Sequence, residues 1–322
     1  MPAPMLEVTQ LTKAYGQYQA LADLSFTAAA GEIVGFVGPN GAGKTTTIRI
    51  LATVLEPTSG EFRVAGIPRN RPDEIRRRIG VLPESAGYPA GRTGQEYLRY
   101  FGRLFGLGRE EADRRARSLL AEFGLQDRAG WPISTYSRGM RQRLGIARAV
   151  VNDPDVVLLD EPTLGLDPAG QRQVLAMVRG LAQDRGAAVL LSTHALPVVE
   201  EICGSVVVLD RGRVVSAGRV AEVSRQVGSH RSSRLRVPAE LVDRARAALE
   251  AVAGPHLEIV ADRSGLLTVD ALATPPDRPG AQTDVGGTVL RAVLDAGIPV
   301  LSFDVDGGRL SDAFLSITRS GR

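Results

Sequence analysis

The chain has 322 residues, a length that fits one large domain with a smaller one, or two domains. Its hydrophobic content of 43% and charged content of 23% are ordinary for a globular protein, and its net charge of +3 argues against a general polyanion-binding protein. No apolar stretch approaches the roughly 18 to 20 residues of a spanning helix, the N-terminus lacks the regions of a signal peptide, and the single cysteine, Cys203, fits a reducing cytosol.

Short strands are predicted for the first part of the chain. Residues 6–11 alternate between apolar and polar side chains, residues 21–27 form a second run, and residues 60–66 form a third. Between the second and third runs, residues 32–37 are apolar enough for a buried strand, and residues 47–52 are predicted to form a helix. The connection between this buried strand and this helix is rich in glycine.

That connection has the spacing of a phosphate-binding P-loop. Its residues are Gly38, Pro39, Asn40, Gly41, Ala42, Gly43, Lys44, Thr45 and Thr46. The glycines allow successive backbone N–H groups to curl around phosphate oxygens, and the helix N-terminus adds partial positive charge. Lys44 is therefore predicted to reach the β- and γ-phosphates of a nucleotide, and the Thr45 hydroxyl to bind Mg²⁺. A glycine-rich loop without a ligand is the competing interpretation, which the flanking strand and helix disfavour.

The middle of the chain is predicted to be largely helical. After a short basic helix at residues 71–78 and a buried strand at residues 79–82, apolar residues recur every three or four positions. This pattern covers residues 93–104 and 109–123, so we expect a helical subdomain over about residues 84–150.

Two acidic residues follow the next apolar strand. Residues 155–159 form a compact apolar run, and Asp160 and Glu161 come at its end. Because ligands bind at the carboxyl ends of parallel strands, Asp160 is predicted to hold Mg²⁺ and Glu161 to polarise the water that attacks the γ-phosphate. His194 follows the next predicted strand, residues 187–191, and is predicted to donate to that phosphate, although an isolated histidine is more often an ordinary surface residue.

A change of composition toward Ser, Arg, Gly and His near residues 224–233 indicates a linker. Beyond it, the pattern predicts strand, helix, two strands, helix and strand, the split βαβ arrangement of a small α+β domain. These elements are expected at residues 234–237, 239–251, 257–260, 266–269, 285–296 and 300–305. A mobile loop is predicted at residues 273–283 and a last helix at residues 310–317. We expect two domains, residues 1–225 and 226–322.

Taken together, the motifs resemble those of the ATP-binding subunits of ABC transporters. Tyr15 lies where that family stacks an aromatic ring on adenine, residues 136–142 resemble the signature motif, and Asp167 lies in a segment that resembles the D-loop. Glu84 falls at the Q-loop and His194 at the switch histidine. The motifs occur in family order. They imply an α/β P-loop NTPase of the ABC type, with a mainly parallel core sheet, an antiparallel β subdomain and a helical subdomain.

Two motifs depart from the usual family pattern. The signature is usually Leu-Ser-Gly-Gly-Gln, and here Arg138 and Met140 replace the first glycine and the glutamine, while Ser137 and Gly139 are kept. Glu84 replaces the Q-loop glutamine; a carboxylate can still bind Mg²⁺ or water, but it cannot donate as an amide does. Both variants are similar to those of the exporter branch, which includes drug-, antibiotic- and lipid-exporting ATPases.

The resemblance implies ATP and Mg²⁺ as ligands and a head-to-tail dimer, expected to be a homodimer, that closes on ATP. Each signature segment would face the γ-phosphate bound by the other subunit. The catalytic residues implied are Glu161, His194, Lys44 and Glu84, with Thr45, Asp160 and Glu84 at the metal. The pore would lie in a separate permease, which would hold this chain at the cytoplasmic face of the membrane; no nucleic-acid partner is expected.

The docking groove for the permease is expected in the helical subdomain. The aromatic residues Tyr88, Tyr97 and Phe101 are candidates for its exposed lining, although core packing explains Tyr97 and Phe101 at least as well.

Two other functions compete with an exporter ATPase. A soluble ABC ATPase acting on ribosomes or DNA usually has two such domains or a long coiled-coil insertion, and this sequence shows neither, nor a strongly basic stripe. An importer ATPase with a regulatory C-terminal domain commonly has a β-barrel there, where this chain has the split βαβ pattern. The substrate is set by the permease and is not encoded in this chain.

Overall fold

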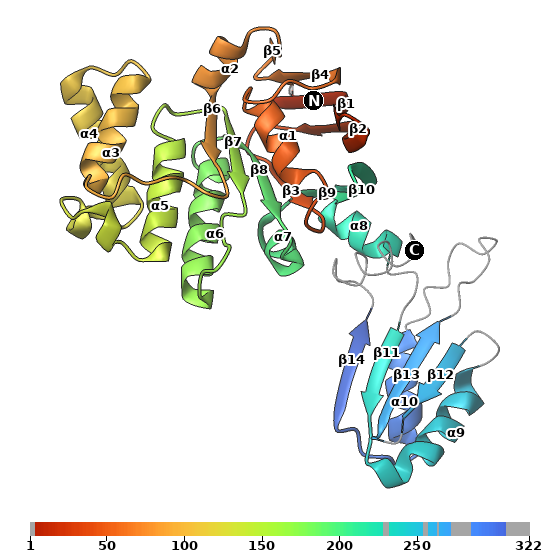
Figure 1. Ribbon diagram of the computed structural model, residues 1–322. Coiled ribbons are helices and arrows are strands. Elements are labelled where there is room, and N and C mark those ends of the chain that lie inside the picture. The colour runs from red at the N-terminus through yellow and green to blue at the C-terminus, as the bar shows by residue number, and fades with distance from the viewer. Residues whose placement is uncertain (1–3, 228–231, 254–256, 263, 272–284, 307–322) are drawn as a thin grey trace. The chain divides into compact units, whose positions relative to one another are not determined.

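The computed structural model describes residues 4–227, 232–253, 257–262, 264–271 and 285–306 (Figure 1). The chain divides into two compact units, Met1–Val220 and Ala221–Arg322. Helix α8 (Val220–Val227) spans this division and occupies the start of the segment predicted as a linker. The proposed domain limits, 1–225 and 226–322, stay a prediction.

A six-stranded sheet in the order β10-β9-β3-β8-β7-β6 forms the centre of the first unit (Figure 1). Its strands are β3 (Ile33–Val37), β6 (Ile79–Leu82), β7 (Val156–Asp160), β8 (Ala188–Thr193), β9 (Ser205–Asp210) and β10 (Arg213–Arg219). β6, β7, β8, β3 and β9 run parallel, and β10 runs antiparallel to β9. Every residue of β3 and β7 is buried, which explains their continuous apolar sequence.

A second sheet in the first unit is antiparallel and has the order β2-β1-β4-β5. Its strands are β1 (Leu6–Tyr15), β2 (Tyr18–Ala28), β4 (Ser59–Val64) and β5 (Ile67–Pro68). β1 continues to Tyr15, beyond the end predicted at residue 11, and a two-residue connection joins it to β2. This hairpin places Tyr15 directly opposite Tyr18.

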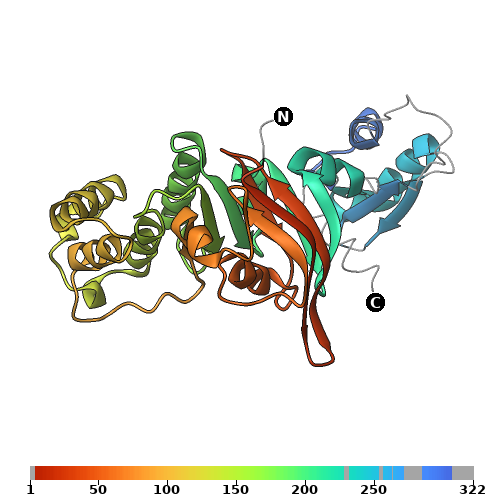
Figure 2. The same ribbon diagram turned by 90° about the horizontal axis from the view of Figure 1, so that it is seen from above.

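The helices of the first unit include those predicted at residues 47–52, 71–78, 93–104 and 109–123, each with one or both ends shifted. They are α1 (Lys44–Leu51), α2 (Pro72–Arg78), α3 (Gly94–Leu104), α4 (Arg109–Glu122), α5 (Arg138–Ala149), α6 (Pro168–Gln183) and α7 (Leu196–Ile202), with 3₁₀ turns at Gln126–Arg128 and Ile133–Thr135. Thr93 and Glu96 close a capping box at the start of α3. Helices α3 and α4 lie at one end of the unit, away from the red antiparallel sheet (Figure 2).

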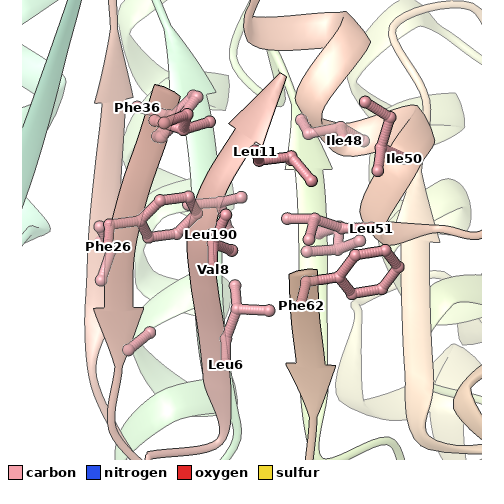
Figure 3. Packing of buried hydrophobic residues seen from close by; sticks show 14 of the residues in the cluster. Leu6, Val8, Leu11, Phe26, Phe36, Ile48, Ile50, Leu51, Phe62 and Leu190 are labelled. Atoms are coloured by element: carbon pink, nitrogen blue, oxygen red, sulfur yellow. The ribbon is translucent and has the colours of Figure 1, made fainter. Parts of the chain in front are cut away.

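The main core lies between the antiparallel sheet, α1 and one face of the central sheet. Figure 3 shows α1 side chains facing those of β1 and Phe62, with Phe26 and Phe36 nearby. The ring centroids of Phe26 and Phe36 are 5.2 Å apart. Gly35 faces the other side of β3, where an added Cβ would lie 2.8 Å from Val199 Cγ1 of α7. The sheet is therefore covered on both faces, which is typical of a chain in which strands alternate with helices.

The second unit has the predicted element order. Its elements are β11 (Ser232–Arg236), a 3₁₀ turn (Ala239–Leu241), α9 (Val242–Ala253), β12 (Leu257–Ala261), β13 (Leu266–Ala271), α10 (Val285–Asp295) and β14 (Ser302–Asp306). The strands pair antiparallel in the order β12-β13-β11-β14. Leu235 and Val269 of the sheet pack with Leu249 of α9 and Val293 of α10. The predicted loop at residues 273–283 and helix at residues 310–317 lie outside the described residues.

Among the described helices, none is both long and apolar enough to cross a lipid bilayer.

Candidate active site

The P-loop connects the carboxyl end of β3 to α1, which begins at Lys44 and not at the predicted residue 47. Gly43 precedes the helix with φ of +106°, a conformation that side chains other than hydrogen rarely adopt. A Cβ at Gly43 would lie 2.5 Å from Leu21 Cδ2 and 2.8 Å from the Ala20 carbonyl oxygen. Both the backbone conformation and the close approach of β2 therefore require glycine at this position.

Lys44 is buried beneath the loop, with 7% of its surface exposed. Its ammonium donates to the carbonyl oxygens of Gly38 at 2.7 Å and Pro39 at 3.2 Å, and so fixes the path of the loop around itself. Burial lowers the pKa of Lys44, while the carboxylates of Glu161, Asp160 and Glu84 act in the opposite direction. These carboxylates reach the site from two other strand ends.

Asp160 and Glu161 come at the carboxyl end of β7. Asp160 is 2% exposed, and its Oδ1 accepts a hydrogen bond from the hydroxyl of Ser192 on neighbouring β8. Glu161 has φ of +48°, unusual for a residue with a side chain. Its backbone N–H donates to both Ser192 oxygens, the carbonyl at 3.1 Å and Oγ at 3.2 Å. The left-handed conformation of Glu161 thus comes with backbone hydrogen bonds that stabilise it.

His194 follows β8 and meets the predicted base. Its Nδ1 lies 2.9 Å from Oε1 of Glu161, while the Glu161 side chain is only 10% exposed and that of His194 is 54% exposed. The sequence placed these residues after two different strands, and the parallel pairing of β7 with β8 brings them together.

These groups surround a cleft of about 350 Å³. Its lining comprises Tyr15, Tyr18, Ala20, Asn40, Gly41, Ala42, Gly43, Lys44, Thr45, Thr46, Glu84, Asp160 and Glu161. Three predicted residues are not part of this lining: Gly38 and Pro39 accept hydrogen bonds from Lys44 through their carbonyls, and His194 contacts Glu161. Tyr15 is 48% exposed and lines the cleft, and Lys13 Nζ lies 5.1 Å from its ring centroid.

The donor set of the cleft fits Mg²⁺. The Thr45 hydroxyl and the carboxylates of Asp160 and Glu84 all line it, and all are oxygen ligands. Mg²⁺ prefers one or two carboxylates completed by water and substrate phosphates, so this sparse set is the appropriate kind. When bound, Mg²⁺ would neutralise charge on the phosphates; these three residues would hold it.

The signature and D-loop segments meet at a different place, a pocket of about 390 Å³ lined in part by Ser137, Arg138, Gly139 and Asp167. Ser137 caps α5 by accepting a hydrogen bond from the Met140 N–H at 3.2 Å. Asp167 caps α6 in the same way, accepting from the Gly170 N–H at 3.1 Å. An added Cβ at Gly165 would lie 2.4 Å from the Arg138 guanidinium carbon, so the D-loop glycine makes room for the signature arginine.

A third pocket, of about 510 Å³, lies in the helical subdomain and is lined by Tyr97, Tyr100, Phe101, Arg103 and Arg148, among others. Of the two readings given for Tyr97, exposed lining or core packing, the structure supports core packing: only 5% of it is exposed, and its hydroxyl accepts a hydrogen bond from Arg148 of α5 at 3.4 Å. Tyr100 is the exposed aromatic, at 62%.

Tyr88 is half-buried and does not line this pocket. Its hydroxyl donates to the Arg141 carbonyl at 2.7 Å, and burial raises its pKa to about 12. Arg148 donates to the Val81 carbonyl on β6 at 2.6 Å, and its guanidinium lies 5.3 Å from the Phe101 ring centroid.

Ala20, Tyr18 and Ser192 of the site were not predicted from the sequence, and the last two carry polar groups. Tyr18 lines the cleft beside Tyr15, and the short connection between two alternating strands was the signal that could have revealed it. Ser192 interrupts an apolar strand, and a fully buried hydroxyl in such a run needs a partner. That partner, Asp160, is known only once β7 and β8 are paired.

Comparisons with known proteins agree with this geometry. The sequence pattern of the ABC transporter family matches residues 21–164. The chain is 38% identical to the daunorubicin/doxorubicin resistance ATP-binding protein DrrA of Streptomyces peucetius, over 98% of this chain and 93% of that protein. It is 39% identical to the Nod factor export ATP-binding protein I of Paraburkholderia xenovorans, over 68% of this chain and 72% of that protein.

Solved structures show the same fold. An ATP-binding subunit of an ABC transporter superposes with a TM-score of 0.63 at 36% identity, covering 70% of this chain and 93% of that chain. The ATP-binding cassette MJ0796, in a dimeric post-hydrolysis state bound to ADP and Pi, superposes with a TM-score of 0.62 at 28% identity, covering 67% of this chain and 98% of that chain. With this cleft and these relatives, the chain belongs to the ABC transporter family, as an ATP-binding and ATP-hydrolysing subunit that uses Mg²⁺.

Proposed function

We propose that this chain powers export of a substrate through a separate membrane-spanning permease. Closure of a dimer on ATP would drive one half of the transport cycle, and ATP hydrolysis would reopen the dimer. Two relatives are named for daunorubicin/doxorubicin resistance and for Nod factor export, which supports the outward direction. The permease would hold the chain at the cytoplasmic face of the membrane, with residues 226–322 as an accessory domain.

One observation in particular supports a dimer. The P-loop cleft and the signature pocket share no lining residue, so Ser137 lies outside the nucleotide cleft of its own chain. Ser137 nevertheless stands at the N-terminus of the 12-residue helix α5, where backbone N–H groups and the helix dipole favour an anion. A second copy placed head to tail would supply that anion as its γ-phosphate. Each homodimer would then have two active sites.

The geometry suggests a role for each group in hydrolysis. Glu161 would take a proton from the attacking water, because its carboxylate lines the cleft and is held by His194 on one side. Lys44 would neutralise the β- and γ-phosphates, and its lowered pKa follows from the burial that the loop imposes. Tyr15 would stack on the adenine ring. With these roles, the main contribution of the protein to hydrolysis is to position the reacting groups and to balance the charge of the phosphates.

The permease would dock at the pocket of the helical subdomain. Tyr100 offers a large exposed ring, and Tyr97 and Phe101, which also line the pocket, pack edge to face with centroids 5.0 Å apart. A short segment of the permease that inserts an apolar side chain here would meet an aromatic surface edged by Arg103 and Arg148.

The test is purification of tagged Glu161→Gln protein from its host, with membranes solubilised in the presence of ATP and Mg²⁺. We expect an ATP-bound dimer that retains a polytopic membrane protein at about one copy per subunit, because hydrolysis no longer releases the closed state. Glu110→Gln, an exposed carboxylate in the first turn of α4, is the matched control and should behave as wild type.

Other outcomes decide against parts of the proposal. Equal ATPase rates for wild type and Glu161→Gln would refute Glu161 as the base. Recovery of ribosomal or DNA-repair proteins without any membrane protein would replace the exporter with a soluble ABC ATPase.

A further inference from the structure

The buried hydroxyl of Ser192 links the two acidic residues of the cleft. Ser192 is fully buried on β8, directly beside Asp160 of β7 in the sheet register. Its Oγ donates to Asp160 Oδ1 and accepts from the Glu161 N–H at 3.2 Å. One hydroxyl therefore contacts both the carboxylate placed at Mg²⁺ and the backbone of the residue placed as the base.

The contact with Asp160 holds a carboxylate that lines the cleft. Oδ1 of Asp160 accepts the hydrogen bond from the serine hydroxyl. A carboxylate that is 2% exposed needs such a donor, since burying it without one is costly. The serine thus both stabilises the buried charge and fixes its rotation.

The contact with Glu161 concerns the direction of the backbone. With φ of +48°, Glu161 adopts a conformation that a residue with a side chain keeps only when its surroundings enforce it. The two Ser192 oxygens, both within 3.2 Å of its N–H, supply that enforcement. Without them the Glu161 carboxylate would lose its fixed direction toward the cleft and His194.

We propose that Ser192 is a positioning residue that couples Mg²⁺ binding at Asp160 to the placement of Glu161. The proposal rests on the roles proposed above for these two residues. Groups that orient a metal ligand from behind typically change metal affinity or activity roughly 10- to 100-fold when removed. We expect effects of that size from loss of this single hydroxyl.

The experiment compares Ser192→Ala, Ser192→Cys and Ser205→Ala. Cysteine is slightly larger than serine and leaves no cavity, but it has only a weak donor, so it separates loss of the hydrogen bond from creation of a cavity. Ser205 is the matched control, because its hydroxyl also donates to a carboxylate, Glu32 Oε1 at 2.6 Å, at the opposite end of the central sheet. Both alanine variants should lower the melting temperature of the nucleotide-free protein by a few degrees.

Two readouts separate positioning from stability. The first is the Mg²⁺ concentration needed for half-maximal binding of a fluorescent ATP analogue, measured without turnover, and the second is kcat against KM for ATP. We expect Ser192→Ala and Ser192→Cys to raise the Mg²⁺ requirement and lower kcat roughly 10- to 100-fold, with KM for ATP nearly unchanged. Ser205→Ala should leave both readouts at the wild-type value.

The proposal would be overturned if Ser192→Ala kept the wild-type Mg²⁺ dependence and kcat. It would also be overturned if Ser192→Cys recovered both in full, because the effect of Ser192→Ala would then be one of packing. Its failure is distinguishable from failure of the base assignment. If Glu161→Gln hydrolyses ATP normally, Glu161 is not the base, yet the shift in Mg²⁺ requirement of Ser192→Ala still reports on Asp160.

Discussion

Two glycines of the P-loop provide a matched pair for measuring how tightly the loop is enclosed. Gly41 and Gly43 have φ of +82° and +106°, so alanine at either position adopts a strained backbone. Nothing lies within 4 Å of the Cβ that Gly41→Ala would add, whereas the Cβ of Gly43→Ala would collide with Leu21 Cδ2 and the Ala20 carbonyl. The first variant thus reports strain alone, and the second reports strain plus overpacking.

The expected sizes follow from these contacts. A left-handed conformation costs an ordinary residue about 1–2 kcal/mol, and overpacking a well-packed site costs about 1–3 kcal/mol more. The Ala20 oxygen belongs to the backbone of β2 and cannot rotate away, so the second cost is not relieved by a side-chain rotation. We expect destabilisation by about 1–2 kcal/mol for Gly41→Ala and about 2–5 kcal/mol for Gly43→Ala.

The assay is urea unfolding of nucleotide-free protein, followed by circular dichroism, with thermal melting as a second probe. For a protein of this size the melting temperature should fall roughly 2–4 °C per kcal/mol. Equal stabilities of the two variants, or a larger loss for Gly41→Ala, would refute the argument that β2 encloses the loop at Gly43.

Two further predictions concern single side chains. Burial raises the pKa of the Cys203 thiol to about 12, so at pH 8 about one thiol in ten thousand is ionised. A thiol-reactive dye should therefore label native protein far more slowly than urea-unfolded protein. Equal labelling rates would contradict the burial of Cys203. Tyr15→Ala should weaken Mg²⁺-free ATP binding about 5- to 100-fold, as expected for loss of a ring stacked on a base, when measured by equilibrium titration. Tyr15→Phe should bind as wild type, and an unchanged affinity in the alanine variant would transfer the stacking role to Tyr18.

Much of the cleft could be predicted because its residues belong to short, local sequence patterns. The P-loop glycines lie between an apolar strand and a helix, and Asp160 and Glu161 end an apolar run, so their spacing along the chain was enough. The burial of Tyr97 and the exposure of Tyr100 could not be read in this way, because they depend on which side of α3 meets α5. Both residues lie on one helix, three positions apart.

The register between neighbouring strands was the other property that could not be predicted from the sequence. The bond from Ser192 to Asp160 and the approach of His194 to Glu161 depend on β7 and β8 being paired without a slip. A slip of one residue would turn Ser192 to the other face of the sheet. Likewise, the Ser- and Gly-rich composition near residue 224 led to the prediction of a linker where α8 continues to Val227. The helix continues because Val220, Val223 and Val227 recur at helical spacing.

Helix α5 has a mechanical consequence. Ser137 caps its first turn at the signature pocket, and Arg148 lies in its last turn, lining the pocket of the helical subdomain. At 1.5 Å per residue, the two ends are separated by about 16 Å of continuous helix. A rigid rod of this kind cannot shift at one end alone. A permease segment that favours one position of Arg148 would change the affinity of Ser137 for the opposing nucleotide, and by thermodynamic reciprocity the nucleotide would change the affinity for the permease by the same factor.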